Sequence, residues 1–328
     1  MKAAWFEKFG SANDVIKVGE FATPTPGRGE VLVRMKASGT NPSDTKKREG
    51  AFPNLLDNGA VIPNSDGAGI IEAVGVGVPH ARIGERVWVY QAQFGRLHGT
   101  AAEYLAIDSC RAVTLPDNVD FEVGACLGIP VMVSHRCVFA DGPVKGKVLL
   151  ITGGAGRVGF YAIQWAKMGG ATVITTAEND EARRDSLAAG ADYMVNHEEP
   201  DWHEQVLKIT GGKKVDRVID VEFGANLPKV LDMIKVGGVI ASYSSMVVPE
   251  PALPFKRMMF MDLTIRMVIV YAMPEEAKEA AIKDITTALE KGQLQHRIAA
   301  RYPLDQFAES NNKIEKGGFF GCVVVDIE

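Results

Sequence analysis

The chain has 328 residues, of which 46% are hydrophobic, 23% charged and 8% aromatic. This length predicts two domains of ordinary size, and the composition is typical of a soluble globular protein. The formal net charge of -5 provides no electrostatic attraction to nucleic acid or to an anionic membrane surface, so we expect neither as a partner.

Nothing in the sequence indicates export or membrane insertion. No apolar run is long enough to span a bilayer. The first residues, MKAAWFEKFG, lack the apolar region and the cleavage site of a secretory signal. The cysteines at 110, 126, 137 and 322 form no Cys-x-x-Cys pair, and we interpret them as free thiols in a reducing compartment. We therefore expect a cytoplasmic protein.

The first third of the chain, residues 1–122, is predicted to be rich in β-strands. Residues 30–40 (EVLVRMKASGT) and 85–93 (ERVWVYQAQ) are alternating or apolar runs bounded by Gly, Pro and Asn. Residues 66–78 (DGAGIIEAVGVGV) are interpreted as a pair of strands in which glycine provides bends.

Strands and helices alternate strictly from Val123 onward. This alternation predicts a parallel, doubly wound sheet, which makes residues 123–294 an α/β domain. The first five expected strands are KVLLITG, ATVITTA, YMVN, VDRVIDVEF and GGVIASYSS. The first four expected helices are GRVGFYAIQWAKM (156–168), NDEARRDSLAAGA, DWHEQVLKITGG and ANLPKVLDMIK.

The last segments complete this organisation. Residues 263–273 (LTIRMVIVYAM) are interpreted as an apolar strand, and residues 274–292 as an amphipathic helix. The final apolar run, CVVVDI, has no helix after it. We therefore expect residues 295–328 to return to the first, β-rich domain.

A glycine-rich loop lies between the first strand and the first helix of the α/β region. Its pattern is Gly154-x-Gly156-x-x-Gly159. Gly154 is expected to permit a tight turn, Gly156 to let the backbone approach a pyrophosphate, and Gly159 to let the helix pack on the strand. Amides at the helix start would then face the anion. The pattern predicts a dinucleotide site; the alternative is a glycine turn without a ligand. The remaining loop residues are Ala155, Arg157 and Val158.

The end of the next strand bears on which dinucleotide is bound. Glu178 would favour NAD if its carboxylate faced the ribose. Thr176 and one of the following arginines, Arg183, would instead accept the 2′-phosphate of NADP. We favour NADPH over NADH on this basis. The alternative for the arginines is a solvated helix face that pairs with Glu181 or Asp185.

Several stretches together resemble one known superfamily, the medium-chain dehydrogenases/reductases, and within it the zinc-free quinone oxidoreductases of the ζ-crystallin-like branch. The resemblance implies a GroES-like catalytic domain (1–122 and 295–328) and a Rossmann domain (123–294). The stretches that carry it are GTNPSDTKKREG, IPNSDGAGIIEAVGVGV, IGERVWVY, GTAAEYLAID, LGIPVMVSHR, VLLITGGAGRVGFYAIQWAK, AGADYMVNH and LEKGQLQHRIAARYPLDQFAES.

The same resemblance bears on zinc. A zinc alcohol dehydrogenase of this superfamily would have Cys at Asn41 and His-Glu at Ser65-Asp66, with a third ligand near Pro130. Amide, hydroxyl and proline do not replace thiolate and imidazole in a tetrahedral zinc site. We therefore expect no metal, and chemistry limited to hydride transfer from nicotinamide to an electron-poor acceptor.

The resemblance also implies the catalytic residues. Asn41 matches an Asn that lies over the nicotinamide; Lys46 stands where the family usually has Tyr; and Phe52 falls at the second aromatic position. The alternatives are a turn role for Asn41 before Pro42, a solvent-directed Lys46, and a packing role for Phe52.

Further coenzyme contacts follow from the same resemblance. His197 matches a position near the adenosine ribose, and Asn226 follows the fourth strand of the α/β domain near the ligand crevice. The other implied contacts are Tyr243, Ser244, Ser245, Val268, Ile269, Val270 and Phe320.

Three functions remain open at this point. The first is an NADPH-dependent quinone reductase. The second is an enone or enoyl-thioester reductase, because the acceptor depends on the shape of the pocket. The third is a nucleotide-binding structural protein with little turnover. In each case the apolar strand at 263–273 predicts a homodimer in which two α/β sheets join edge to edge.

Overall fold

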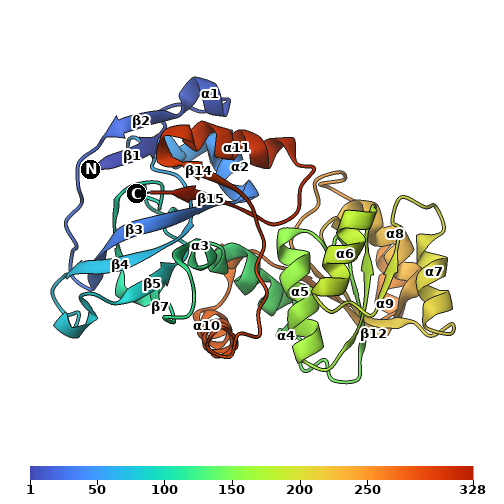
Figure 1. Cartoon of the computed structure of the whole chain (residues 1–328). Coiled ribbons are helices and arrows are strands. Elements are labelled where there is room, and N and C mark those ends of the chain that lie inside the picture. The colour runs from blue at the N-terminus through green and yellow to red at the C-terminus, as the bar shows by residue number, and fades with distance from the viewer. Residues whose placement is uncertain (328) are drawn as a thin grey trace. The chain divides into compact units, whose positions relative to one another are not determined.

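The computed structural model describes residues 1–327 and separates the chain into two compact units, Met1–Ile129 with Ile282–Glu328 and Pro130–Ala281 (Figure 1). The sequence placed these divisions at 122/123 and 294/295. Helix α10 (Glu275–Glu290) spans the later division. Its last turn belongs to the first unit, where the Asn118 side-chain amide donates to the Leu289 carbonyl over 3.1 Å.

The first unit is organised around one long strand, β3 (Glu30–Thr40). Its side chains alternate, and Val31, Val33 and Met35 are buried in the hydrophobic core, as expected for a strand with one covered face. The sheet order is β14-β15-β3-β4-β5-β7, with β6 also paired to β3 and a separate β1-β2 pair. The other strands are β1 (Lys2–Trp5), β2 (Lys17–Glu20), β4 (Asp66–Val74), β5 (Arg86–Val89), β6 (Tyr104–Asp108), β7 (Ala112–Thr114), β14 (Ile298–Pro303) and β15 (Cys322–Asp326).

The C-terminal strand returns to this sheet, as the sequence predicted. β15 pairs antiparallel with β3, so that Val325 lies opposite Ser38, and parallel with β14. The segment 66–78, in contrast, contains one strand, β4 (Asp66–Val74), rather than the predicted pair. The glycines of β4 are explained by close backbone approach, because a Cβ at Gly69 would lie 2.2 Å from the Arg34 carbonyl oxygen.

Short helices cover the strands of the first unit. Figure 1 shows α2 and α11 side by side, and the Arg48 Nε of α2 donates to Asn311 Oδ1 of α11 over 3.4 Å. The helices and 3₁₀ turns are α1 (Ala12–Val15), α2 (Pro42–Arg48), α3 (Phe121–Gly124), α11 (Phe307–Lys316), η1 (Pro53–Leu56), η2 (His80–Arg82), η3 (Ser109–Arg111) and η6 (Leu304–Gln306). The π-turn η4 (Leu127–Val131) crosses the earlier division between the units.

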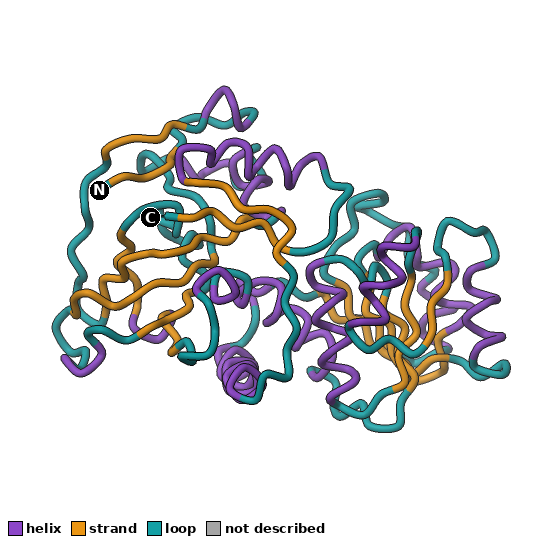
Figure 2. The backbone as a smooth tube through the Cα atoms, viewed as in Figure 1, coloured by secondary structure: helices purple, strands orange, loops and turns teal. Residues whose placement is uncertain are grey.

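The second unit contains a six-stranded sheet in which every pairing is parallel. The order β10-β9-β8-β11-β12-β13 places the first strand in the middle, so the chain reverses direction across the sheet between β8 and β11. Figure 2 shows helices on both sides of these strands. The bounds are β8 (Val148–Ile151), β9 (Thr172–Thr176), β10 (Tyr193–Val195), β11 (Val215–Asp220), β12 (Ile234–Ser242) and β13 (Thr264–Met267).

The helices of this unit follow the predicted alternation. α4 packs on α5 through His135 and Trp165, whose rings meet edge to face with centroids 5.2 Å apart. The expected strand over 263–273 is shorter than predicted: β13 ends at Met267, and η5 (Val270–Ala272) follows. The helices are α4 (Met132–Phe139), α5 (Arg157–Met168), α6 (Asp180–Ala188), α7 (Trp202–Ile209), α8 (Phe223–Met233) and α9 (Phe255–Phe260). Within residues 1–327 no helix is both long and apolar enough to cross a membrane.

Candidate functional site

The glycine loop connects β8 to α5 at the point where the strand order reverses. Gly153 takes a positive φ of 65°, a conformation that glycine adopts without the Cβ penalty of other residues. Its amide donates to Thr176 Oγ1 over 2.8 Å, so the loop is anchored to the end of β9. The tight turn that the sequence assigned to Gly154 is therefore made by Gly153.

The other glycines of the loop are required by close approach. A Cβ at Gly154 would lie 2.0 Å from Thr175 Oγ1, and a Cβ at Gly159 would lie 2.2 Å from the Gly153 carbonyl oxygen. Gly156 occupies the N-cap position of α5 with extended backbone angles. Gly154 thus permits packing against β9, and Gly159 permits α5 to begin directly against the loop, as its predicted packing role requires.

The amino end of α5 is suited to an anion. The helix runs for 12 residues from Arg157, no side chain caps its first turn, and that turn contains no acid. The first amides of any helix have no acceptor within the helix, and the aligned peptide dipoles favour negative charge there. Together with the preceding glycines, these amides fit a pyrophosphate group.

A buried carboxylate braces this loop, and sequence reasoning missed it. Asp220 ends β11; its Oδ1 accepts from Thr152 Oγ1 at 2.7 Å, from Asn226 Nδ2 at 2.8 Å and from the Glu222 amide at 3.0 Å. Burial raises the pKa of Asp220, while these donors oppose the rise. An acid at the carboxyl end of a central parallel strand could have identified it. Asn226 thus donates to Asp220, the carboxylate that holds the glycine loop through Thr152.

The residues expected to contact the adenosine end of the coenzyme differ in burial. The Thr176 side chain is buried and accepts the Gly153 amide, so its hydroxyl is part of the loop. Arg183 is exposed on α6, whose start is capped by Asn179 Oδ1 accepting the Ala182 amide at 2.8 Å. His197 is exposed in the turn after β10. Arg183 and His197 are therefore both accessible at the surface, whereas Thr176 is not.

A cavity of the second unit is lined by several of the predicted coenzyme contacts. It has a volume of about 400 Å³ and is lined at the ends of β12 and β13 by Tyr243, Ser244, Ser245, Val268 and Ile269. The Val268 amide donates to the Ser242 carbonyl at 2.7 Å, which keeps the chain after β13 against β12. Burial raises the pKa of Tyr243. Val270 is buried and does not line this cavity.

One carboxylate holds the loop beside that cavity. Glu222 accepts three consecutive backbone amides, from Met246 at 2.7 Å, Val247 at 3.0 Å and Val248 at 3.2 Å. The Ser245 Oγ accepts the Gly224 amide at 2.9 Å from the start of α8. The loop after β12 is therefore fixed by its backbone, which leaves the apolar side chains of 246–248 exposed.

In the first unit, Asn41 belongs to a buried polar cluster. Its Nδ2 donates to Asp66 Oδ2 over 2.8 Å, and the Ile129 amide donates to the same oxygen over 2.8 Å. The Asn41 amide itself donates to Asp44 Oδ2 over 2.9 Å at the start of α2. Burial raises the pKa of Asp66 to about 8, a rise that its hydrogen bonds to Ile129 and Asn41 oppose and the nearby Asp44 carboxylate adds to.

The two adjacent lysines of α2 have opposite environments. Lys46 is half-exposed and forms an ion pair with Glu49 at 3.0 Å. Lys47 is buried, and its Nζ donates to the Gln93 carbonyl over 2.5 Å and to Ser65 Oγ over 3.2 Å. The structure therefore directs Lys47, rather than the expected Lys46, toward the interior. The spacing of Asp44 and Lys47, one helical turn apart, could have signalled this.

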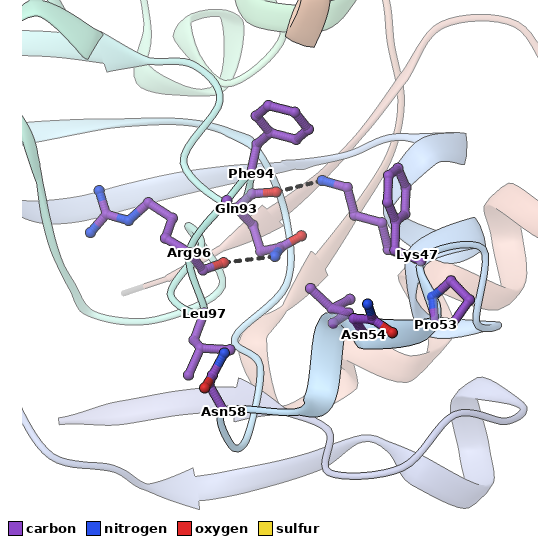
Figure 3. Close-up of a pocket in the computed structure, with 11 residues that line it drawn as sticks. Lys47, Pro53, Asn54, Asn58, Gln93, Phe94, Arg96 and Leu97 are labelled. Atoms are coloured by element: carbon purple, nitrogen blue, oxygen red, sulfur yellow. Dashed lines mark hydrogen bonds between the residues drawn. The ribbon is translucent and has the colours of Figure 1, made fainter.

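Lys47 borders a cavity of the first unit that has a volume of about 560 Å³ (Figure 3). Phe52 and Phe94 supply aromatic walls, 42% and 43% exposed, and Asn54 and Asn58 supply amides. Figure 3 shows Lys47 reaching to the Gln93 carbonyl at one side of this space. Phe52 thus lines a cavity, as its predicted role requires, whereas Lys46 does not line it.

Phe320, the remaining predicted contact, lies before β15 in the first unit. The Arg297 guanidinium stands 5.7 Å from the centre of its ring, and Lys313 Nζ stands 4.7 Å from the centre of the neighbouring Phe319 ring. Both rings are partly exposed, and each has a cationic side chain over it in a cation–π contact. Gly321 beside them takes a φ of 106°, which orients the chain into β15.

Comparison with protein-family models covers both units. Residues 27–117 match the alcohol dehydrogenase GroES-like domain, and residues 158–287 match the zinc-binding dehydrogenase family. The quinone oxidoreductase of Homo sapiens is 30% identical over 321 residues, covering 97% of this chain and 94% of that protein. Quinone oxidoreductase 1 of Escherichia coli (strain K12) is 33% identical over 247 residues, covering 73% of this chain and 72% of that protein.

Solved structures agree with these relatives. The Escherichia coli quinone oxidoreductase complexed with NADPH aligns with a TM-score of 0.88 and 26% identity, covering 99% of this chain and 100% of that chain. A mycobacterial quinone oxidoreductase aligns with a TM-score of 0.86 and 28% identity, covering 99% of both chains. The two-domain fold expected from the sequence is therefore confirmed.

One matching family is described as a zinc-binding dehydrogenase, so the residues at the expected ligand positions bear on whether this chain could hold zinc. The three positions named for zinc hold Asn41, Ser65 and Pro130, with Asp66 beside them. The Asp66 carboxylate already accepts two N–H donors, and among residues 1–327 no group of three or more His, Cys, Asp or Glu side chains is placed to hold a metal. This donor set does not fit a tetrahedral zinc ion.

Proposed function

The chain belongs to the quinone oxidoreductase branch of the medium-chain dehydrogenase/reductase superfamily, and from this premise we propose that it is an NADPH-dependent quinone reductase that works without zinc. The reaction moves a hydride from NADPH, together with one proton, to an electron-poor carbonyl acceptor. A bound reduced nicotinamide supplies the hydride. The protein's own residues bind and orient the coenzyme and the acceptor and supply the proton.

The single observation that supports coenzyme binding best is the uncapped amino end of α5 behind the glycine loop. Gly153 shapes the turn, Asp220 braces it through Thr152, and the α5 amides are positioned for the pyrophosphate. We assign the nicotinamide carboxamide of the coenzyme to the cavity lined by Ser244 and Val268. Arg183, on the exposed face of α6, is assigned to the 2′-phosphate.

The acceptor is assigned to the cavity of the first unit. Its volume of about 560 Å³ suits a small aromatic molecule, since ligand pockets of this size are common. Phe52 and Phe94 offer apolar faces to a quinone ring, and Asn54 and Asn58 offer amide donors to carbonyl oxygens. Asn41 lies in the polar cluster that continues from this cavity through Lys47 and Ser65.

The direct test is the oxidation of NADPH at 340 nm with a quinone panel and an enone panel, each repeated with NADH. We expect turnover with quinones, and higher kcat/KM with NADPH than with NADH. Elemental analysis of the same active sample should find no stoichiometric zinc. Faster turnover with enones would reassign the acceptor class, and tight NADPH binding without turnover on either panel would indicate a nucleotide-binding structural protein.

A further inference from the structure

The side chain of Lys47 is enclosed by polar groups from three segments. Its Nζ donates to the Gln93 carbonyl at 2.5 Å and to Ser65 Oγ at 3.2 Å, and it stands 4.0 Å from Asp44 Oδ1. Ser65 Oγ donates in turn to Asp44 Oδ1 at 3.4 Å. The ammonium is therefore held in one position at the edge of the acceptor cavity, which it also lines.

Burial and two neighbouring carboxyl groups act in opposite directions on the pKa of this lysine. Burial lowers the pKa of Lys47, while the carboxylates of Asp44 and Asp66 oppose that fall. Asp44 belongs to the same helix as Lys47, and Asp66 begins β4. A desolvated ammonium with a lowered pKa gives up a proton more readily than a lysine in water, because burial disfavours its charged form.

The cavity itself favours developing negative charge. Among its described lining residues, the charged side chains are Lys47 and Arg96, and no carboxylate lines it. The Arg96 guanidinium is directed to the Ala106 carbonyl, away from Gln93, whose Nε2 donates to the Arg96 carbonyl at 2.9 Å (Figure 3). Of these two cations, Lys47 is the one held at Gln93, and it shares the lining of the cavity with Phe52 and Phe94.

We infer that Lys47, and not its neighbour Lys46, is the general acid that protonates the reduced acceptor in the cavity formed by Phe52, Asn54, Gln93 and Phe94. This inference rests on the proposed reductase function. It adds to that function the identity of the proton donor, and it assigns Asp44 the role of a positioning residue that holds the ammonium through its charge and through Ser65.

The step balances with the groups named. The acceptor gains two electrons as a hydride from the reduced coenzyme, and one acceptor oxygen becomes anionic. An N–H bond of the Lys47 ammonium breaks and an O–H bond forms on that oxygen, which leaves a neutral amine. Water entering the cavity after product departure returns the proton. One NADPH and one proton are consumed for each acceptor reduced.

The experiment measures kcat and KM with 1,4-naphthoquinone for the wild-type protein and for Lys47→Met, Lys47→Ala and Lys46→Met. We expect kcat to fall about 100-fold in both Lys47 variants, the scale of general-acid catalysis, with the KM for NADPH unchanged. Methylammonium added to Lys47→Ala should restore part of kcat in proportion to its concentration, because it can occupy the space of the missing ammonium.

A pH profile separates catalysis from a purely structural role. Asp44→Asn removes a carboxylate that raises the pKa of Lys47, so the alkaline limb of the kcat profile should move to lower pH. If Lys47→Met does not fold, because Asp44 is left buried without its ion pair, the double variant Asp44→Asn with Lys47→Met removes both charges. Its kcat should remain about 100-fold low.

Four results would overturn the inference. Wild-type kcat in a folded Lys47 variant would remove Lys47 from the chemistry while leaving the reductase function intact. Absence of methylammonium rescue together with an unmoved pH profile would reduce Lys47 to a packing role. An equal fall in kcat for Lys46→Met would remove the distinction between the two lysines. If the wild-type protein oxidises no NADPH with any acceptor, the proposed function fails and this inference fails with it.

Discussion

The side-chain amide of Asn41 donates to a carboxylate oxygen of Asp66 over 2.8 Å, and both residues are buried. The other oxygen of Asp66 makes no hydrogen bond within residues 1–327 and lies where a Cβ on Gly128 would approach to 2.1 Å. Asn41 and Asp66 therefore form a buried polar cluster at two of the positions compared with zinc ligands above, and Lys47 contacts Ser65 beside them. The charges of this cluster decide how this unit responds to pH.

The first prediction concerns stability and Asp66. Its folded-state pKa of about 8 lies above the model-peptide value near 3.8, so between these values the folded protein binds one proton more than the unfolded chain. The free energy of unfolding should therefore fall as pH rises through this window, by at most about 1.4 kcal/mol per pH unit from this group. Asp66→Asn, which does not titrate, should lack this contribution.

Urea unfolding of the wild type and Asp66→Asn at pH 5, 6, 7 and 8 measures the effect. The difference in unfolding free energy between the two proteins should grow in favour of the variant as pH rises. Asp117→Asn, at a fully exposed carboxylate, is the matched control and should run parallel to the wild type. A difference that stays constant from pH 5 to 8 would contradict a raised pKa at Asp66.

The second prediction concerns Gly159. Its Cβ would lie 2.2 Å from the Gly153 carbonyl oxygen, so Gly159→Ala must shift the backbone of the coenzyme loop. We expect a loss of about 1–3 kcal/mol in stability, the usual cost of overpacking, and weaker NADPH binding. Chemical denaturation and NADPH fluorescence titration measure the two effects.

A matched glycine is available in the first unit. Gly19 in β2 has ordinary contact distance for a new Cβ, 3.5 Å from the nearest atom of Trp5. Gly19→Ala should bind NADPH as the wild type does. Unaltered NADPH affinity in Gly159→Ala would show that α5 and the loop tolerate displacement, and would argue against the assigned pyrophosphate site.

The third prediction concerns coenzyme choice. Arg183 is exposed on α6, and its loss should remove a charge-assisted contact to the 2′-phosphate. Arg183→Met should raise the dissociation constant for NADPH about tenfold or more, while the constant for NADH stays the same. Calorimetric titration with both coenzymes measures this. Arg184→Met is the comparison on the same helix; an effect there instead of at Arg183 would transfer the role.

The fourth prediction concerns assembly. β13 is the edge strand of the parallel sheet, and its Met267 is 62% exposed. Other exposed apolar side chains follow β12 and form α9, including Val247, Phe255 and Phe260. An uncovered apolar edge favours pairing with another strand, so we expect a homodimer through β13.

Size-exclusion chromatography with light scattering should give about twice the chain mass of 35.4 kDa. Met267→Lys places a charge on the edge and should shift the protein toward monomer. Val236→Lys, at an exposed apolar residue at the start of β12, is the control and should leave the mass unchanged. A wild-type protein that elutes only as monomer would refute edge pairing.

The sequence alone determined the architecture. Strict alternation of apolar strands and amphipathic helices predicted the parallel sheet, because each parallel connection needs a helical crossover. The glycine pattern after β8 identified the loop that we propose binds the nucleotide. An apolar strand with no helix after it predicted that β15 would join the first sheet. These features are local in the chain, so the residues that carry them are visible without coordinates.

Only the tertiary structure decided which side chains face the cavity. Lys46 and Lys47 are adjacent in α2, and a helix turns each residue about 100° from the last, so packing against Ser65 and Gln93 determines which lysine is buried. The positive φ of the turn belongs to Gly153, whereas Gly154 is required by its close approach to Thr175 of β9. Asp220 and Thr152 are 68 residues apart in the chain, and their contact exists only because β8 and β11 are neighbours in the sheet.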